Sequence, residues 1–340
     1  MEQLPIKNFS YEELIACLNS LDEKPFRATQ IFEWIYQRGV FSFEDMRNLP
    51  QKLRERLKKD FVLSELVLIE KQVSQDGTTK FLFELNDKER IETVLIPTKT
   101  RNTVCVSTQV GCKFGCKFCA SAIGGFKRNL TTAEIIEQIL HVGDVTHVVF
   151  MGIGEPLDNY DAVMKSIRII NDKKALNIGA RRITISTCGI IPQMKKFAQE
   201  GRQIELSVSL HGYDNESRNI LMPVNRKYPF GELMQACRDY QKKTKRQITF
   251  EYVLIKEVTC TFNAATKLAR AFKGLICKMN LIPYNEVPDG VFRAPSSREI
   301  RDFKKELEKL GIHVTTRISR GEDIAAACGQ LRRTNFVKQK

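Results

Sequence analysis

The sequence lacks any long hydrophobic run. No apolar stretch approaches the ~20 residues that a membrane-spanning helix needs, and the N-terminus MEQLPIKNFSYEE lacks the basic and then apolar pattern of a signal peptide. The composition also lacks the bias of collagenous, low-complexity or disordered chains, because 42% of its 340 residues are hydrophobic and 28% are charged. We therefore expect a cytoplasmic protein with no membrane partner. Its length excludes a single small domain and leaves room for one large unit with an appendage.

The sequence has fewer acidic than basic side chains. The 54 Lys and Arg residues outnumber the 40 Asp and Glu residues, which gives a net charge of +14. Residues 1–60 contain ten acidic and ten basic side chains, so the whole excess lies in residues 61–340. An excess of this size favours a polyanionic partner, because neutralising phosphates releases counterions. No basic amphipathic anchor is evident, so nucleic acid is preferred over a membrane surface, although solubility alone also explains a basic chain.

The first part of the chain predicts helices followed by a small sheet. Ser10 and Glu13 form a capping box ahead of one helix, and residues 27–39 match a second. Three later segments alternate like strands of an antiparallel sheet: residues 66–73, 78–85 and 90–97. We place a boundary within residues 95–102.

From Thr103 onward the pattern changes to strand, loop and helix, repeated. The predicted strands are residues 103–108, 146–151, 182–187, 204–210, 248–254 and 277–283, with a further segment at 313–318. Mostly apolar strands with helical crossovers predict a parallel sheet. Eight strands would close a barrel, so we predict an α/β fold with a partial, TIM-like (β/α)6 barrel whose chemistry lies on the loops after the strands. We divide the chain into an accessory domain (1–98), the barrel (99–320) and a C-terminal tail (321–340).

Ten cysteines in a cytoplasmic chain indicate metal or redox chemistry, because that compartment keeps structural disulfides reduced. Cys112, Cys116 and Cys119 form C-x3-C-x2-C in the loop after the first barrel strand. Zinc would need a fourth ligand nearby, whereas three cysteines on a four-iron cluster leave one iron open to a ligand from outside the protein. The spacing favours the cluster. The isolated cysteines are typical of small buried hydrophobes: Cys17, Cys188, Cys237, Cys260 and Cys277.

This cysteine motif, placed after the first strand of a partial barrel, resembles the signature of the radical S-adenosylmethionine (SAM) superfamily. Nearly the whole chain resembles the RlmN/Cfr family of adenine methyltransferases. The matching motifs are GGFKRNLTTAEII (124–136), MGIGEPL (151–157), ISTCGIIP (185–192), SLH (209–211), LMPVN (221–225), CKMNLIPYN (277–285) and ACGQL (327–331). GGFKRNL and CKMNLIPYN are more similar to the RlmN branch, which methylates C2 of adenine, than to the Cfr branch, which methylates C8. The family often has Asp where this chain has Ala325, which we interpret as variation without loss of function.

The resemblance implies a cofactor set. It predicts a [4Fe-4S] cluster on Cys112, Cys116 and Cys119, with SAM on the open iron, two SAM molecules used per turnover, and a low-potential electron donor such as flavodoxin. GIGEP resembles the family's glycine-rich contact to SAM, and a dinucleotide-binding motif does not fit because its third glycine is missing. The positions that match SAM contacts are Gly154, Glu155, Ser186, Ser209, Leu210, His211 and Asn285.

The resemblance also assigns roles to two further cysteines and a carboxylate. Adenine C2 is an electron-poor carbon that cannot attack the methyl group of SAM, so the family uses a cysteine as methyl carrier, and Cys328 occupies that position. Cys105 matches the thiol that resolves the protein–base thioether through a transient disulfide. Glu92 matches the proposed proton acceptor. The expected substrates are 23S rRNA and tRNA, and the enzyme is expected to be a monomer.

Two alternatives stay open. One is C8 methylation of the same ribosomal adenosine, and the other, from a different class, is a zinc-containing RNA-binding module. In either case the target base of a folded RNA must leave its stack to be reached. Candidate contacts to the RNA backbone, each equally compatible with a solvated face, are the run KLRERLKK (52–59) and Arg332, Arg333, Lys338 and Lys340 of the tail.

Overall fold

A ten-stranded sheet organises the molecule in the computed structural model, which describes residues 3–285, 291–317 and 319–331. The strands, in spatial order, are β14 (Val314–Thr316), β13 (Cys277–Pro283), β12 (Ile248–Leu254), β11 (Glu205–Ser209), β10 (Ile183–Thr187), β9 (His147–Phe150), β6 (Asn102–Cys105), β5 (Arg90–Pro97), β4 (Thr79–Glu84) and β3 (Val67–Val73). Those from β6 to β14 run parallel. The two edge strands of this sheet do not pair with one another within the described residues, so the barrel stays open.

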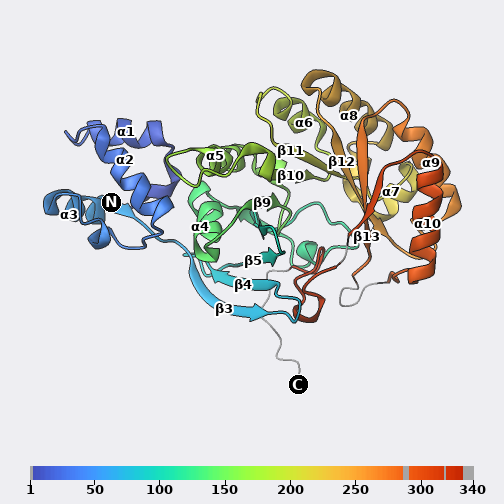
Figure 1. Ribbon diagram of the computed structural model, residues 1–340, viewed down its shortest axis with the longest axis horizontal. Coiled ribbons are helices and arrows are strands. Elements are labelled where there is room, and N and C mark those ends of the chain that lie inside the picture. Colours follow the sequence, from blue (N-terminus) through green and yellow to red (C-terminus); the bar gives the residue numbers. More distant parts are fainter. Residues whose placement is uncertain (1–2, 286–290, 318, 332–340) are drawn as a thin grey trace.

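Helices cover the outer face of the parallel strands (Figure 1). They are α4 (Thr132–Val142), α5 (Tyr160–Asn171), α6 (Ile191–Phe197), α7 (Asn215–Leu221), α8 (Phe230–Thr244), α9 (Phe262–Phe272) and α10 (Ser297–Lys309). The side chains of β12 point alternately towards the outer helices and towards the barrel interior. Phe250 stacks on Phe272 of α9 and Tyr252 on Phe303 of α10, while the alternate residues face the barrel interior. The predicted partial (β/α) barrel is confirmed, and the segment at 313–318 adds β14 as a seventh parallel strand.

The N-terminal helices form a separate lobe at one end of the molecule (Figure 1). They are α1 (Tyr11–Asn19), α2 (Phe26–Phe32), which continues as a π-helical turn over Glu33–Gln37, and α3 (Gln51–Asp60). The capping box of Ser10 and Glu13 forms as predicted. A short parallel pair, β1 (Leu4–Pro5) and β2 (Phe61–Val62), closes this lobe. Lys7 ties it to the barrel, because its ammonium lies 3.1 Å from the Glu137 carboxylate of α4 in a buried ion pair.

The small N-terminal sheet is continuous with the barrel sheet. β3, β4 and β5 are antiparallel, and β5 pairs with β6 across our predicted boundary at residues 95–102. Pairing with β5 gives hydrogen-bond partners to the backbone groups at the edge of β6, which would otherwise be exposed and unpaired. The three-part division of the chain stays a prediction. No described helix is long and apolar enough to cross a membrane, and Arg332, Arg333, Lys338 and Lys340 lie outside the described residues.

Candidate active site

Two connected cavities occupy the inside of the open barrel. The smaller, of about 170 Å3, lies at the C-terminal ends of the strands, and we call it the rim cavity. The larger, of about 530 Å3, runs along the inner faces of the strands, and we call it the lumen. Both are lined by Met151, Gly152, Glu251, Arg317 and Cys328, which therefore mark their junction. The loops after parallel strands meet at one end of such a barrel, so the rim cavity stands where chemistry is expected.

The three motif cysteines line the rim cavity. Their loop is carried by a hairpin of β7 (Gln109–Gly111) and β8 (Phe126–Asn129) that the periodicity did not predict. Gly111 makes the hairpin possible, since its φ is +76° and a Cβ there would lie 1.8 Å from the carbonyl oxygen of Gly125. Burial raises the pKa of the Cys112 thiol to about 12 and also raises those of Cys116 and Cys119. Without a bound cation these groups are neutral thiols.

The glycine-rich loop after β9 packs against the end of β6. A Cβ on Gly152 would lie 2.7 Å from the Val106 carbonyl group, and a Cβ on Gly154 would lie 2.5 Å from Cβ of Gln109. Glu155 shapes this loop, because its carboxylate accepts hydrogen bonds from the amides of Leu157 and Cys188, at 3.0 and 2.7 Å. Both oxygens of Glu155 thus have protein partners. The close approach leaves the backbone of the loop at the cavity wall.

His211 faces the rim cavity with an unusual backbone conformation, φ +48°. Its Nδ1 accepts a hydrogen bond from the Val253 amide at 3.0 Å, so the proton of the neutral ring is on Nε2. Burial, and then the charge of Arg218, lowers the pKa of His211 to about 3. Leu210 points elsewhere, since its side chain is fully buried and lines neither cavity.

Polar side chains complete the wall of the rim cavity. The hydroxyls of Ser186 and Ser209, from β10 and β11, are 3.4 Å apart. Asn285, after β13, donates from Nδ2 to the Cys328 carbonyl oxygen at 2.9 Å and accepts from Ser319 at 2.8 Å. In this structure Asn285 therefore holds the tail. The predicted SAM contacts, apart from Leu210, share one cavity.

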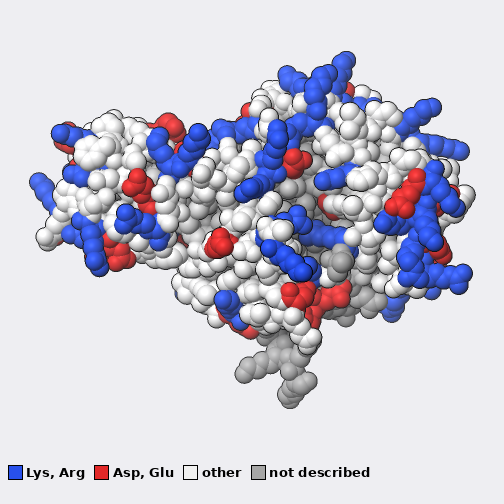
Figure 2. Space-filling model, viewed as in Figure 1, with Lys and Arg blue, Asp and Glu red and all other residues white. Residues whose placement is uncertain are grey.

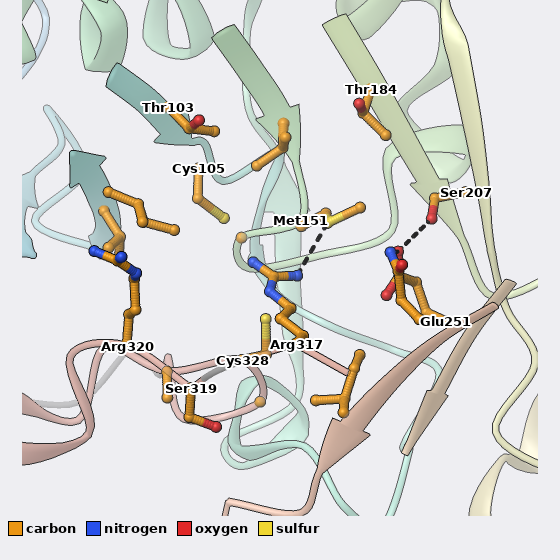
Figure 3. Close-up of a pocket in the computed structure, with 18 of the residues that line it drawn as sticks. Thr103, Cys105, Met151, Thr184, Ser207, Glu251, Arg317, Ser319, Arg320 and Cys328 are labelled. Carbon is orange, nitrogen blue, oxygen red and sulfur yellow. Dashed lines mark hydrogen bonds between the residues drawn. The ribbon is translucent and has the colours of Figure 1, made fainter. Parts of the chain in front are cut away.

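Cys105 and Cys328 both line the lumen although they lie 223 positions apart in the sequence (Figure 3). Cys105 ends β6, and Cys328 belongs to the tail. The side chain of Arg317, which follows β14, lies between the two sulfurs in Figure 3. The charge of Cys328 is the largest cause of a raised Arg317 pKa. Burial, and then the charge of Cys328, raises the pKa of Cys105 to about 12.

Glu92 lies deeper in the sheet than these groups and lines neither cavity. It shares the inner face of β5 with Val94, which does line the lumen and pairs with Cys105. The Glu92 carboxylate forms a buried ion pair with Lys80 at 3.2 Å, and Lys80 also donates to the Ala325 carbonyl oxygen. Glu92 is thus linked to the tail through Lys80.

The comparisons with known proteins cover nearly the whole chain and point to one family. Residues 106–263 match the radical SAM superfamily, and residues 5–63 match the ribosomal RNA large subunit methyltransferase N-terminal domain. A probable dual-specificity RNA methyltransferase RlmN of Geobacillus kaustophilus is 50% identical over 96% of this chain and 92% of its own. One from Clostridium novyi is 47% identical over 98% of both chains.

This chain belongs to the RlmN family of radical SAM RNA methyltransferases. A crystal structure of a radical SAM methyltransferase from Sphaerobacter thermophilus, 42% identical, superposes with a TM-score of 0.94 and covers 96% of this chain and 99% of that one. The family assignment confirms the predicted resemblance and removes the alternative of a zinc-containing RNA-binding module.

The motif cysteines fit the iron–sulfur cluster that the superfamily implies. Within the described ranges, no three His, Cys, Asp or Glu side chains converge as ligands of a single metal ion. All three thiols line one cavity, and a four-iron cluster takes each thiolate on a different iron. The ten cysteines, all of which are described, are free, so no disulfide joins Cys105 to Cys328 here. The transient disulfide stays a prediction.

Our sequence analysis missed two residues at the junction of the cavities, Arg317 and Glu251. Glu251 had a recognisable signal, because it is a charged residue inside an otherwise apolar, fully buried strand, ITFEYVL. Its Oε1 accepts hydrogen bonds from Ser207 and Asn280, and its buried Oε2 has no hydrogen-bond partner among the described residues. Arg317 follows a short edge strand, and nothing in the sequence around it indicates that it lines a cavity.

Proposed function

We propose that this enzyme methylates C2 of an adenosine in 23S rRNA and in tRNA, with Cys328 as methyl carrier. The observation that carries the proposal is the convergence of Cys328 and Cys105 on one cavity that adjoins the cavity of the motif cysteines. A methyl carrier must reach both the cofactor and the base, and Cys328 lines both spaces.

Cys112, Cys116 and Cys119 would hold the [4Fe-4S] cluster, and the polar wall of the rim cavity would hold SAM. When bound, these cofactors supply the methyl group and the one-electron chemistry that an unreactive C2 requires. His211, with its proton on Nε2, can donate to an acceptor atom of SAM, while Gly154 leaves backbone exposed at the wall. We further propose two SAM molecules per turnover, a low-potential donor such as flavodoxin, and a monomeric enzyme.

Cys105 is our proposed resolving thiol, since it lines the same cavity as Cys328. In our proposal its thiolate attacks the Cys328 sulfur, so that an S–S bond forms while the bond from sulfur to the methylene carbon breaks. The electron pair of the broken bond stays with the carbon of the base adduct, which takes up a proton and becomes the methyl group. Burial favours the protonated form of Cys105, so the attack requires that its proton be removed. The neighbouring charge of Arg317 favours the thiolate. Glu92, which forms a buried ion pair with Lys80, is our proposed proton acceptor.

The test is the nucleoside composition of RNA from cells that lack this enzyme and carry either the wild type or Cys328→Ala. We expect 2-methyladenosine with the wild type and none with the variant, at equal iron content of the two purified proteins. The appearance of 8-methyladenosine would instead assign C8 chemistry. Formation of 2-methyladenosine by Cys328→Ala would make Cys328 a structural residue.

A further inference from the structure

The lumen differs from the interior of an ordinary barrel. Layers of branched apolar side chains normally fill that space, but here it holds a cavity of about 530 Å3, within the range of small-molecule sites. One side of its wall is polar, because the inward-facing residues of β11 and β12 include Glu205, Ser207, Thr249 and Glu251, whereas Val94 and Val149 make the other side apolar. A cavity of this size with one polar side is suited to a ligand that carries both apolar surface and polar groups.

Cations surround the end of the lumen that is remote from the motif cysteines. Arg101 directly precedes β6, Arg182 directly precedes β10, and Lys278 is the second residue of β13, so all three stand at N-terminal ends of parallel strands. Arg320 reaches the same end, since its guanidinium donates to the carbonyl oxygen of Pro97, which pairs with Asn102 at the start of β6. We call Arg101, Arg182, Lys278 and Arg320 the mouth cations.

The mouth cations stand outside the ion pairs of the described residues, and Glu205, the acidic side chain at the start of β11, pairs with Arg246 instead. None of them forms an ion pair with an acidic side chain in the part of the chain that the structure describes. Burial, and then the charges of Arg101 and Arg182, lowers the pKa of the neighbouring His147. Figure 2 shows Lys and Arg side chains gathered about the hollowed middle of the molecule, over the barrel. The basic helix α3 is different, because Lys58 pairs with Glu44 and Arg56 with Asp60.

At the inner end of the lumen, Glu251 lies near the cation Arg317. There the buried Glu251 presents an oxygen, Oε2, without a hydrogen-bond partner among the described residues. An unpartnered buried carboxylate oxygen is costly and calls for a donor. An adenosine nucleotide has the matching polarity, with an amino group on the base and negative charge on its phosphates.

The tail covers the opposite end of the barrel. The Gly329 carbonyl oxygen accepts from the Ala120 amide at 2.6 Å, and that of Leu331 accepts from Ser121 at 2.8 Å, so the tail is bound to the loop of the motif cysteines. A base that approached from that side would have to displace these contacts.

We propose that the target nucleotide enters through the mouth cations, which bind its flanking phosphates, and that Glu251 accepts a hydrogen bond from the amino group of the inserted adenine. This inference rests on the proposed function and adds the route and the recognition of the substrate. Enzymes that act on a nucleobase extrude it into such a pocket, and contacts to phosphates position the nucleic acid without reading its sequence.

The route is tested by comparing two triple variants that lose the same charge. Arg101→Ala/Arg182→Ala/Lys278→Ala removes three mouth cations, and Lys52→Ala/Arg56→Ala/Lys58→Ala removes three from α3, two of them paired with acidic side chains. The probe is a synthetic RNA hairpin with one unpaired adenosine in its loop, bound by anaerobically purified enzyme with its cluster. We expect the mouth variant to bind at least about tenfold more weakly, with a shallower salt dependence by about one unit per lost phosphate contact. The α3 variant should lose much less.

Equal weakening by the two variants would show an effect of net charge alone and overturn the route, as would wild-type binding by the mouth variant. Because binding is measured and not methylation, these results are independent of the reaction. If the wild type yields no 2-methyladenosine in cells but the mouth variant still loses binding, the proposed function fails while the route stands.

The inner contact is tested by Glu251→Gln with the same hairpin and with one that carries purine riboside, which lacks the amino group, in place of the unpaired adenosine. We expect the wild type to prefer adenosine by about tenfold. In the variant, an amide nitrogen that replaces Oε2 would face the amino group, so the preference should disappear. A wild type without preference, or a variant that keeps it, would contradict the contact. Equal iron content and thermal midpoint of the two proteins serve as the control for folding.

Discussion

At the scale of single residues, the two lumen cysteines have environments that suit different tasks. Cys105 is buried at the end of a strand, and its high pKa makes it unreactive towards solutes at neutral pH. Cys328 is partly exposed and lines both cavities, so it can meet more than one partner. A resolving thiol that stays protonated until its target arrives avoids premature disulfide formation.

Cys105→Ala should trap the enzyme on its substrate. If Cys328 becomes bonded to the base through a methylene group, water does not cleave the resulting thioether, and the variant has no thiol to do so. Protein purified from cells should carry RNA, visible as nuclease-sensitive slow bands on a denaturing gel. The double variant Cys105→Ala/Cys328→Ala is the control and should carry none. Normal turnover by Cys105→Ala would assign Cys105 to packing alone.

His211 makes stability depend on pH. Its pKa is about 3 when buried in the folded protein, against 6.5 for a free histidine, so the unfolded chain binds more protons between these values. The stability that neutral His211 contributes is therefore complete above pH ~6.5 and is lost as the pH falls towards 3.

On lowering the pH from 7 to 5, the unfolding free energy of the wild type should fall more steeply than that of His211→Asn. The difference in slope should approach about 1.4 kcal/mol per pH unit. Asn is chosen because it tolerates the positive φ of this position. Urea unfolding at several pH values measures the slopes, and parallel slopes would contradict a neutral, buried His211.

At the scale of elements, the β7–β8 hairpin decides whether the motif cysteines can act together. Gly111 and Gly124 both have positive φ, +76° and +86°, yet only at Gly111 would a Cβ collide with backbone. A Cβ on Gly124 meets nothing within 4 Å. A comparison of substitutions at Gly111 and Gly124 therefore distinguishes the effect of the backbone collision from the effect of a positive φ alone. A positive φ costs a non-glycine residue about 1–2 kcal/mol.

Gly111→Ala should therefore lose most of its iron, because the strands of the hairpin must separate, whereas Gly124→Ala should keep most of it. Iron and sulfide content after anaerobic purification gives the comparison. Equal iron in the two variants would show that the hairpin does not support the cluster.

At the scale of the whole molecule, hydrogen bonds join the N-terminal sheet to the C-terminal tail. The turn between β3 and β4 contacts the tail, as Figure 1 shows, because the Asp76 carboxylate accepts from the Gly321 amide at 3.0 Å and the Asp323 carboxylate accepts from Gln75 at 3.2 Å. Although burial raises the pKa of Asp76, its hydrogen bonds from Thr78 and Gly321 hold it at about 2. The N-terminal sheet therefore positions the segment that carries Cys328.

Asp76→Ala should loosen the tail without affecting the cluster. Hydrogen bonds to a charged group contribute about 1.5–3 kcal/mol, so the tail should open on the order of tenfold more often. Limited trypsin cleavage after Arg320 measures the opening, and methylation should slow at unchanged iron content. Asp76→Asn, which keeps an acceptor oxygen, should be intermediate. Wild-type cleavage by Asp76→Ala would show that other contacts hold the tail.

Local pattern by itself determined most elements and the cluster motif. The period of two in the strands, the capping box of Ser10 and Glu13 and the C-x3-C-x2-C spacing each act over a few residues, so they can be recognised without coordinates. The family resemblance supplied the rim residues Ser186, Ser209 and His211, which lie at the C-terminal ends of β10 and β11 or directly after them.

Only the tertiary structure decided which distant groups meet. The joining of β5 to β6, the burial of Glu92 against Lys80, and the approach of Cys328 to Cys105 depend on contacts between segments far apart in sequence. The unpartnered oxygen of Glu251 and the unpaired mouth cations were likewise beyond local reasoning. A side chain's need for a partner depends on which atoms surround it after folding, and no neighbour in sequence supplies that information.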